Sequence, residues 1–211
     1  MPLDKLEKIS STRTLAIWHV TETEEELQAL LGDNYNKVSL SEIKAPTKRL
    51  EFLSSRALLN TISNEVGYSY SGVGKNEYGK PLLNGSNLEL SISHSFPYVA
   101  VIIDQISEVG IDLEQPKEKI QRIAQKFCSE SELSFAKNDQ TLLCIIWSAK
   151  EALYKIYSKK EVIFNEHLII EPFELSSSGT IDATIDINDY QKKVILQYRV
   201  HSDYVLVYNL N

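Results

Sequence analysis

The sequence is poor in cysteine and lacks both long apolar stretches and an excess of positive charge. Its two cysteines, Cys128 and Cys144, form no Cys-x-x-Cys motif, so we expect small buried residues in a reducing compartment. The longest apolar runs fall far short of a membrane span. The net charge of −7 argues against a general nucleic-acid binder but still allows a local basic patch. The N-terminal residues resemble no signal peptide, which predicts a cytoplasmic protein.

The chain does contain enough apolar sequence for a real core. Of its 211 residues, 43% are apolar and 24% are charged, which indicates a globular protein of one or two small domains. The predicted elements run strand, helices, strands, and then repeat that order. We therefore expect an α+β fold with two halves, residues 1–104 and 105–211.

An apolar helix is predicted over residues 141–157, with Asp139 as its N-cap. Its apolar residues recur at helical spacing, so most of the helix should be buried against a sheet. Trp147, Glu151 and Lys155 follow one another at four-residue intervals and therefore share one face. Two interpretations of this face stay open: a surface salt bridge, or a carboxylate and an ammonium held in a cleft.

The first half is expected to begin with a strand at residues 15–20. A helix ending at residue 31 should follow, capped by Thr21 and Glu24. A helical turn is expected at residues 41–44.

A long helix is predicted over residues 47–66, opened by Pro46 and closed by Gly67. One of its faces is basic. That face fits either a solvated surface or an anion site, because arginine offers a rigid fork for phosphate. Its basic residues are Lys48, Arg49 and Arg56.

Residues 73–83 are rich in glycine and proline and should be extended with turns. Within them, Lys80 and Pro81 follow a glycine in a turn that would bring backbone and an ammonium close together. That arrangement suits a phosphate or a base edge, although most such tripeptides are plain turns.

A hairpin is predicted from the strands at residues 88–93 and 98–104. Ser93 and His94 come where the first strand meets its loop. Strand ends position side chains well, so this pair is a candidate for function, although a lone histidine is more often structural.

Residues 109–114 read as a short strand with alternating faces. Gly110, Asp112 and Glu114 point to one side, and the glycine should leave room for a ligand. Two carboxylates two residues apart on a strand can share one hard cation. Alternating polar residues on a half-exposed strand would give the same pattern.

An amphipathic helix is predicted over residues 117–127, and a capped short helix should begin at Ser129. The outer face of the first helix is basic, which in an acidic protein suggests an acidic partner. Its basic residues are Lys117, Lys119, Arg122 and Lys126.

After the apolar helix at residues 141–157, four strands are expected at residues 168–175, 180–187, 193–200 and 204–210.

Four short motifs occur in order along the chain, and an arginine precedes them. They are GKP at 79–81, SISHS at 91–95, VGIDLE at 109–114 and WSAKEALYK at 147–155, after Arg56. Together they resemble the 4′-phosphopantetheinyl transferase superfamily in its longer, Sfp-like form. The shorter, trimeric carrier-protein synthases of that superfamily fit this chain length less well. The resemblance implies two similar α/β halves related by a pseudo-twofold axis, with the active site in the cleft between them.

The resemblance implies a holo-[acyl-carrier-protein] synthase-type enzyme. It would transfer the 4′-phosphopantetheine arm of coenzyme A to a serine of an apo acyl or peptidyl carrier protein, releasing 3′,5′-ADP. The implied cofactor is Mg²⁺, held by Asp112, Glu114 and Glu151. Glu151 would also act as the base, Lys155 would stabilise charge at the pyrophosphate, and His94 would contact phosphate.

The remaining residues implied for coenzyme A binding lie in the first half. They are Arg56 with Lys48 or Lys44 at the 3′-phosphate, Lys80 and Pro81 near the adenine and its phosphates, and Ser93 beside His94.

The basic residues of 117–126 then become candidate docking residues for an acidic carrier protein. A chain that forms its cleft between its own halves should be a monomer. Two other functions stay open: a pseudoenzyme that binds coenzyme A or a carrier without transfer, and a Mg²⁺-dependent phosphohydrolase. The identity of the carrier and the choice between Mg²⁺ and Mn²⁺ are also left open.

Overall fold

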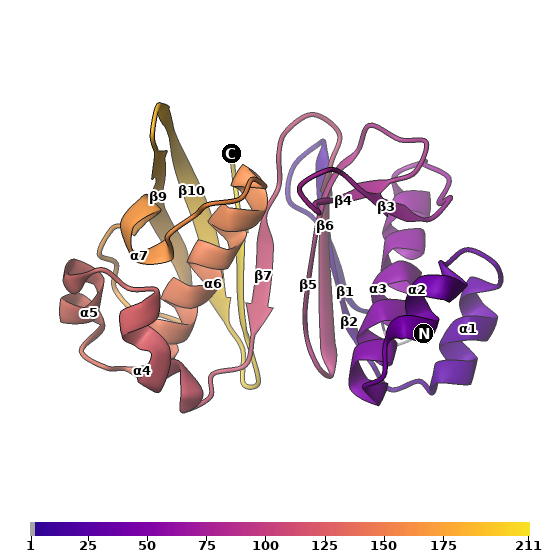
Figure 1. The fold of residues 1–211 in the computed structure, drawn as a ribbon, viewed down its shortest axis with the longest axis horizontal. Coiled ribbons are helices and arrows are strands. Elements are labelled where there is room, and N and C mark those ends of the chain that lie inside the picture. Colours follow the sequence, from indigo (N-terminus) through magenta and orange to yellow (C-terminus); the bar gives the residue numbers. More distant parts are fainter. Residues whose placement is uncertain (1–2) are drawn as a thin grey trace. The chain divides into compact units, whose positions relative to one another are not determined.

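The computed structural model describes residues 3–211 (Figure 1), and the chain divides into two compact units, Met1–Glu108 and Val109–Asn211. Each unit combines helices with antiparallel strands, so the mixed α and β content predicted from the sequence is confirmed. Within the described residues, no helix is long and apolar enough to cross a membrane.

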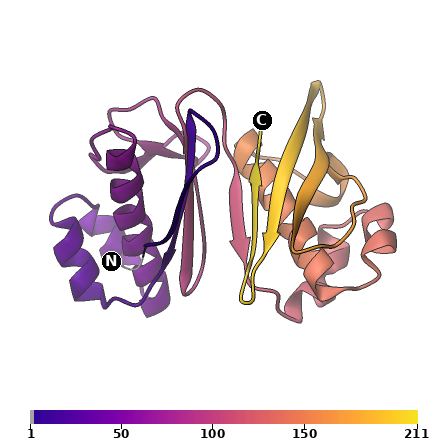
Figure 2. The ribbon, with the colours of Figure 1, turned by 180° about the vertical axis from the view of Figure 1, so that it is seen from behind.

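A four-stranded antiparallel sheet of order β1-β2-β6-β5 forms one layer of the first unit. Its strands are β1 (Leu3–Lys8), β2 (Arg13–His19), β5 (Glu89–Ser95) and β6 (Tyr98–Asp104). Helix α3 (Pro46–Glu65) packs on this sheet (Figure 2), where its Leu53 and Leu58 share a core with Val99 and Val101. The predicted β5–β6 hairpin is confirmed.

Helix α3 has the boundaries that the sequence predicts. Pro46 is its first residue, and Gly67 follows it with a φ of +83°, a conformation that glycine adopts readily.

The predicted cap of α1 (Glu24–Leu31) was wrong by two residues. Thr23, not Thr21, caps this helix, with Glu26 bonded back to the Thr23 N–H at 2.8 Å. Both pairs have the same Thr-x-x-Glu spacing, so the pattern alone did not separate them.

Three small elements border α3. They are α2 (Lys37–Glu42) and the two-stranded sheet of β3 (Val73–Lys75) and β4 (Pro81–Leu83). The helical turn predicted at 41–44 was wrong, because the helix begins earlier. The Asn36 side chain caps it by accepting from the Ser39 N–H at 2.9 Å.

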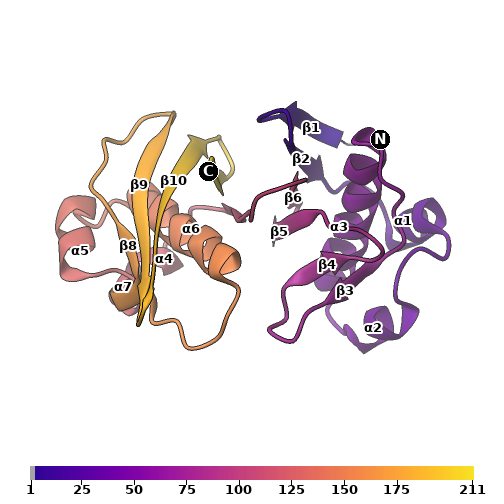
Figure 3. The same cartoon turned by 90° about the horizontal axis from the view of Figure 1, so that it is seen from above.

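The second unit has a five-stranded antiparallel sheet of order β7-β11-β10-β9-β8. Its strands are β7 (Ile111–Glu114), β8 (Leu168–Ile170), β9 (Ser178–Ile187), β10 (Tyr190–Val200) and β11 (Val205–Asn209). Helix α6 (Gln140–Tyr157) lies across one face of this sheet (Figure 3). Asp139 caps it by accepting from the Leu142 N–H, as predicted.

Short helices complete the second unit: α4 (Lys119–Ile123), the 3₁₀ turn η1 (Ala124–Lys126), α5 (Glu130–Ala136) and α7 (Phe164–His167). The Ser129 capping box of α5 is confirmed. The single helix predicted over 117–127 is instead α4 followed by η1. Strand β1 and helix α7 were not predicted, because each carries too few apolar residues to give a clear period.

Both cysteines are free and buried, as the sequence suggested. Burial raises the pKa of Cys128 to about 12 and raises the pKa of Cys144 as well. Because the thiolate is the reactive form, neither residue is suited to nucleophilic chemistry.

A buried ion pair holds α5 and α6 together. The fully buried Lys150 lies with its Nζ 2.6 Å from Glu132 and donates to the Phe164 carbonyl oxygen at 2.9 Å. Glu132 also accepts from the Ile170 N–H at 3.0 Å. Each charge therefore has several partners, and the pair is part of the core.

Gly110 brings the start of β7 directly against α6. A Cβ added at this position would lie 2.1 Å from the Ala152 carbonyl oxygen and 2.8 Å from the Ile156 side chain. The expectation that this glycine leaves room for a ligand was therefore wrong, because the helix backbone fills that space. The missing side chain lets β7 approach α6 closely enough for residues of the two elements to share one site.

We expect Gly110→Ala to lower the free energy of unfolding by about 3 kcal/mol, because the new methyl group meets rigid backbone. Urea unfolding measures this loss. Gly74→Ala is the matched control, since its Cβ would meet only the end of the Asn84 side chain at 2.9 Å. Equal losses in the two variants would contradict the tight contact at Gly110.

Candidate active site

Three carboxylates from two elements of the second unit lie within electrostatic reach of one another. Asp112 and Glu114 come from β7, and Glu151 comes from the neighbouring helix α6. The pKa of Glu151 is raised to about 7, chiefly by burial and then by the charge of Asp112, with a smaller contribution from Glu114. Such crowding of like charges is costly in a folded core and is typical of functional sites.

Lys155 reaches across from α6 to β7. Its Nζ donates to the Ile111 carbonyl oxygen at 2.8 Å and to the Asp112 carboxylate at 2.9 Å. Among the described residues its ion pair is with Asp112 and not with Glu151, so the helix-surface salt bridge considered above is wrong. The Lys155 charge still lowers the pKa of Glu151, against the larger effect of burial.

The carboxylate group fits a hard divalent cation by its chemistry. Mg²⁺ prefers a few carboxylate oxygens together with phosphate oxygens and water. Within residues 3–211, however, no three His, Cys, Asp or Glu side chains are arranged as a ready set of metal ligands. The Lys155 ammonium supplies positive charge at Asp112 in this arrangement.

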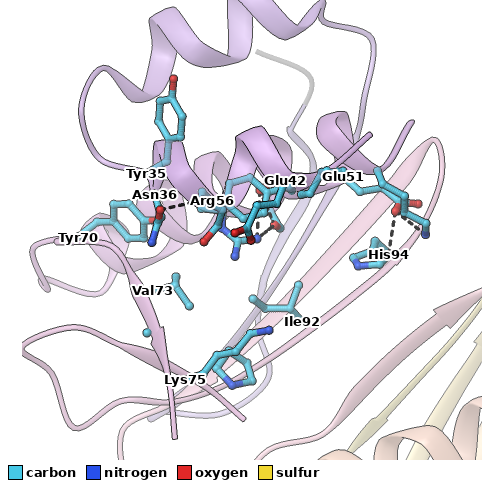
Figure 4. Close-up of a pocket in the computed structure, with 17 residues that line it drawn as sticks. Tyr35, Asn36, Glu42, Glu51, Arg56, Tyr70, Val73, Lys75, Ile92 and His94 are labelled. Atoms are coloured by element: carbon cyan, nitrogen blue, oxygen red, sulfur yellow. Dashed lines mark hydrogen bonds and ion pairs between the residues drawn. The ribbon is translucent and has the colours of Figure 1, made fainter. Parts of the chain in front are cut away.

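A pocket of about 740 Å³ lies in the first unit (Figure 4). Its walls come from α2, α3, β3, β4 and β5. Four of the residues singled out in the sequence line it: Lys48, Arg56, Pro81 and His94. The fold thus brings together side chains that are up to 46 positions apart, from Lys48 to His94.

Arg56 presents a guanidinium to this pocket without a carboxylate partner among the described residues. It stacks over the Phe52 ring at 3.7 Å and donates to the Ser55 hydroxyl at 2.9 Å. Burial lowers the pKa of Arg56, although the group stays charged. Arg49, by contrast, pairs with Glu24 at the foot of α1, so it has a structural role.

Glu51 links two of the predicted residues, and the sequence interpretation missed it. Its buried carboxylate lies 2.7 Å from the Lys48 Nζ and 3.2 Å from the His94 Nδ1, and it accepts from the Phe96 N–H at 3.2 Å. Lys48 is therefore neutralised within the protein. The only sequence signal was the three-residue spacing from Lys48 to Glu51 on a helix.

The other predicted residues of the first unit do not line the pocket. Lys80 forms an ion pair with Glu89 at 2.5 Å, and Ser93 is buried in β5. Lys44 is exposed and lies outside the pocket lining. Lys75, which the sequence did not single out, does line it.

The second unit thus carries an acidic site with a lysine, and the first carries a pocket with an arginine whose charge no ion pair among the described residues balances. Both suit a protein that handles phosphorylated ligands. Residues 108–208 match the family model of the 4′-phosphopantetheinyl transferase superfamily. The match spans slightly less than half of the chain and contains Asp112, Glu114, Glu151 and Lys155. It supports the superfamily and, in general terms, phosphopantetheinyl transfer; no curated protein matches the chain.

The raised pKa of Glu151 predicts a pH-dependent stability. A carboxyl group whose pKa is 4.5 in the unfolded chain and about 7 in the folded protein binds more protons when folded. The free energy of unfolding therefore falls as the pH rises from 4.5 to about 7. Above this pH range, the ionised side chain costs on the order of 3 kcal/mol. Glu151→Gln should therefore be more stable than the wild type at pH 8 and similar to it at pH 5.

Urea unfolding at the two pH values, with a chelator present, measures this difference. A stability difference that is the same at both pH values would show that Glu151 titrates normally. Glu166→Gln is a suitable control, because Glu166 lies outside the carboxylate group, in the short helix α7.

Proposed function

We propose that this protein transfers the 4′-phosphopantetheine arm of coenzyme A to a serine of an apo acyl or peptidyl carrier protein, releasing 3′,5′-ADP. It would be of the longer, Sfp-like type and would depend on Mg²⁺. The observation that carries this proposal is the group formed by Asp112, Glu114 and Glu151 with Lys155, inside the segment that matches the superfamily. The pseudo-twofold axis and the cleft expected from the resemblance stay predictions.

The second unit would carry the chemistry. Asp112, Glu114 and Glu151 would hold the Mg²⁺, which when bound neutralises charge on the pyrophosphate. Glu151 accepts the proton of the attacking serine hydroxyl as the bond to phosphorus forms. Lys155 exchanges its contact with Asp112 for one with the pyrophosphate oxygens, where negative charge develops. The bond between the attacked phosphorus and the bridging oxygen of the pyrophosphate breaks, 3′,5′-ADP leaves with that oxygen, and the proton ends on Glu151.

The first unit would bind the nucleotide end of coenzyme A in its pocket. Arg56 is best placed for the 3′-phosphate because no carboxylate among the described residues balances its charge. His94, with its Nδ1 held by Glu51, would contact phosphate, and Pro81 would border the adenine. Lys48, Lys80 and Ser93 are proposed as weaker contributors, since the two lysines are already paired and the serine is buried.

Incubation with coenzyme A, Mg²⁺ and a panel of apo carrier proteins tests the proposal. The expected result is a carrier whose intact mass rises by one phosphopantetheine arm. Glu151→Gln should lower the rate by about 10²–10⁴-fold, the usual effect of losing a general base. Asp112→Ala should lower the rate of transfer and also weaken its dependence on Mg²⁺.

The same experiment separates the alternatives. Coenzyme A binding without modification of any carrier would favour the pseudoenzyme. Free phosphopantetheine released without a carrier would favour the phosphohydrolase. Undiminished transfer by Glu151→Gln would remove Glu151 from the mechanism.

We also propose that the basic residues of the segment that follows β7 in the chain dock the carrier. These residues are Lys117, Lys119, Arg122 and Lys126, all exposed and without ion-pair partners among the described residues. Carrier proteins with acidic surfaces would be attracted to them, most strongly at low salt.

Reversing two of these charges, in Lys119→Glu with Arg122→Glu, should raise the KM for the carrier several-fold and leave coenzyme A affinity unchanged. Steady-state kinetics with varied carrier measures the first effect, and titration with coenzyme A measures the second. Lys160→Glu with Lys193→Glu gives the same change in net charge at two other exposed sites. If both double variants raise the KM equally, the effect is one of net charge and not of docking.

A further inference from the structure

Tyr70 lines the pocket with a hydroxyl group that has no partner. The side chain is 8% exposed, and its buried oxygen forms no hydrogen bond with the described residues. Burial raises the pKa of Tyr70 to about 12, so the hydroxyl keeps its proton at neutral pH and can act as a donor. Tyr70 lies in the stretch between α3 and β3, on the opposite side of the pocket lining from His94 (Figure 4).

A buried hydroxyl without a partner is unfavourable, because folding removes its bonds to water without replacing them. Two other buried hydroxyls, those of Ser63 and Ser148, are also unpartnered, but neither residue lines the pocket. Of these three residues, only Tyr70 borders the pocket.

Arg56 defines the charge of such a ligand. Its guanidinium and the Tyr70 ring border the same pocket, and the charge of Arg56 acts on the Tyr70 hydroxyl. Two carboxylates line the same pocket: Glu51 is already paired with Lys48 and His94, and Glu42 forms no ion pair with Arg56. Among the described residues, Arg56 offers a positive charge without an ion-pair partner, and Tyr70 offers a hydrogen-bond donor without an acceptor. A ligand group that satisfies both is anionic and has several acceptor oxygens, as a phosphate monoester does.

We propose that Tyr70 is a specificity-determining residue that recognises a phosphate monoester together with Arg56. Its hydroxyl donates to a phosphate oxygen, and the guanidinium balances the phosphate charge. This inference rests on the proposed function, in which the phosphate is the 3′-phosphate of coenzyme A. It adds Tyr70, which lies outside every motif of the resemblance, to the groups that distinguish a 3′-phosphorylated nucleotide from one without that phosphate.

Calorimetric titration of the whole chain with adenosine 3′,5′-bisphosphate and with adenosine 5′-monophosphate tests the inference. The wild type should bind the bisphosphate more tightly. Tyr70→Phe should weaken bisphosphate binding by about 10-fold or more, as expected for a lost hydrogen bond to a charged group, and leave monophosphate binding unchanged. Tyr68→Phe is the matched control, because Tyr68 lies two residues away and does not line the pocket.

The thermal stability of the unliganded variants separates a binding role from a structural one. Removing a hydroxyl that has no partner should leave the Tm of Tyr70→Phe equal to or above that of the wild type. A clear fall in Tm would mean that the hydroxyl stabilises the fold, and it would overturn the inference.

The remaining outcomes are also distinct. If Tyr70→Phe and the wild type bind the bisphosphate equally, Tyr70 is not part of the recognition, while the proposed function stands. If the wild type binds neither nucleotide, the coenzyme A site itself is wrong, and this inference falls with it.

Discussion

The close approach of β7 to α6 at Gly110 is the constraint on which the candidate chemistry depends. Any side chain at this position would collide with the Ala152 carbonyl oxygen, so only glycine lets the strand lie against the helix. Two residues further along β7, Asp112 then comes within hydrogen-bond distance of Lys155, and its charge acts on Glu151. A strand held farther away would leave an ordinary surface carboxylate in place of a shared acidic site.

Some buried charged residues in this chain have all the charge and hydrogen-bond partners that they need within the protein, and others do not. Arg13 with Asp104, and Lys150 with Glu132, are buried pairs with additional backbone hydrogen bonds, and they belong to the two cores. Glu151 is different, because burial and like charges raise its pKa. In the first kind each buried charge is compensated, so losing one partner would be strongly destabilising, whereas the second kind persists where a ligand completes it.

The basic face of α3 shows the same division within a single helix. Arg49 is held by Glu24, Lys48 is held by Glu51, and Arg56 meets no carboxylate among the described residues. The two interpretations of this face, a solvated surface and an anion site, therefore do not apply to all three residues alike. Only Arg56 keeps a charge available to a ligand, and the unpartnered Tyr70 hydroxyl borders the same pocket.

The sequence by itself determined the elements whose period is strong, above all α3 and α6, because apolar spacing and terminal caps are local properties. It also placed Asp112 and Glu114 on one face of a strand. It could not determine which of two Thr-x-x-Glu pairs caps α1. It also could not identify Glu51 and Tyr70, because no local sequence pattern shows which distant residues a side chain will contact. Tertiary structure alone decided that Lys155 pairs with Asp112, that Gly110 makes room for a helix, and which basic residue keeps its charge unbalanced. Partner choice between distant side chains depends on packing in three dimensions, and spacing along the chain does not encode it.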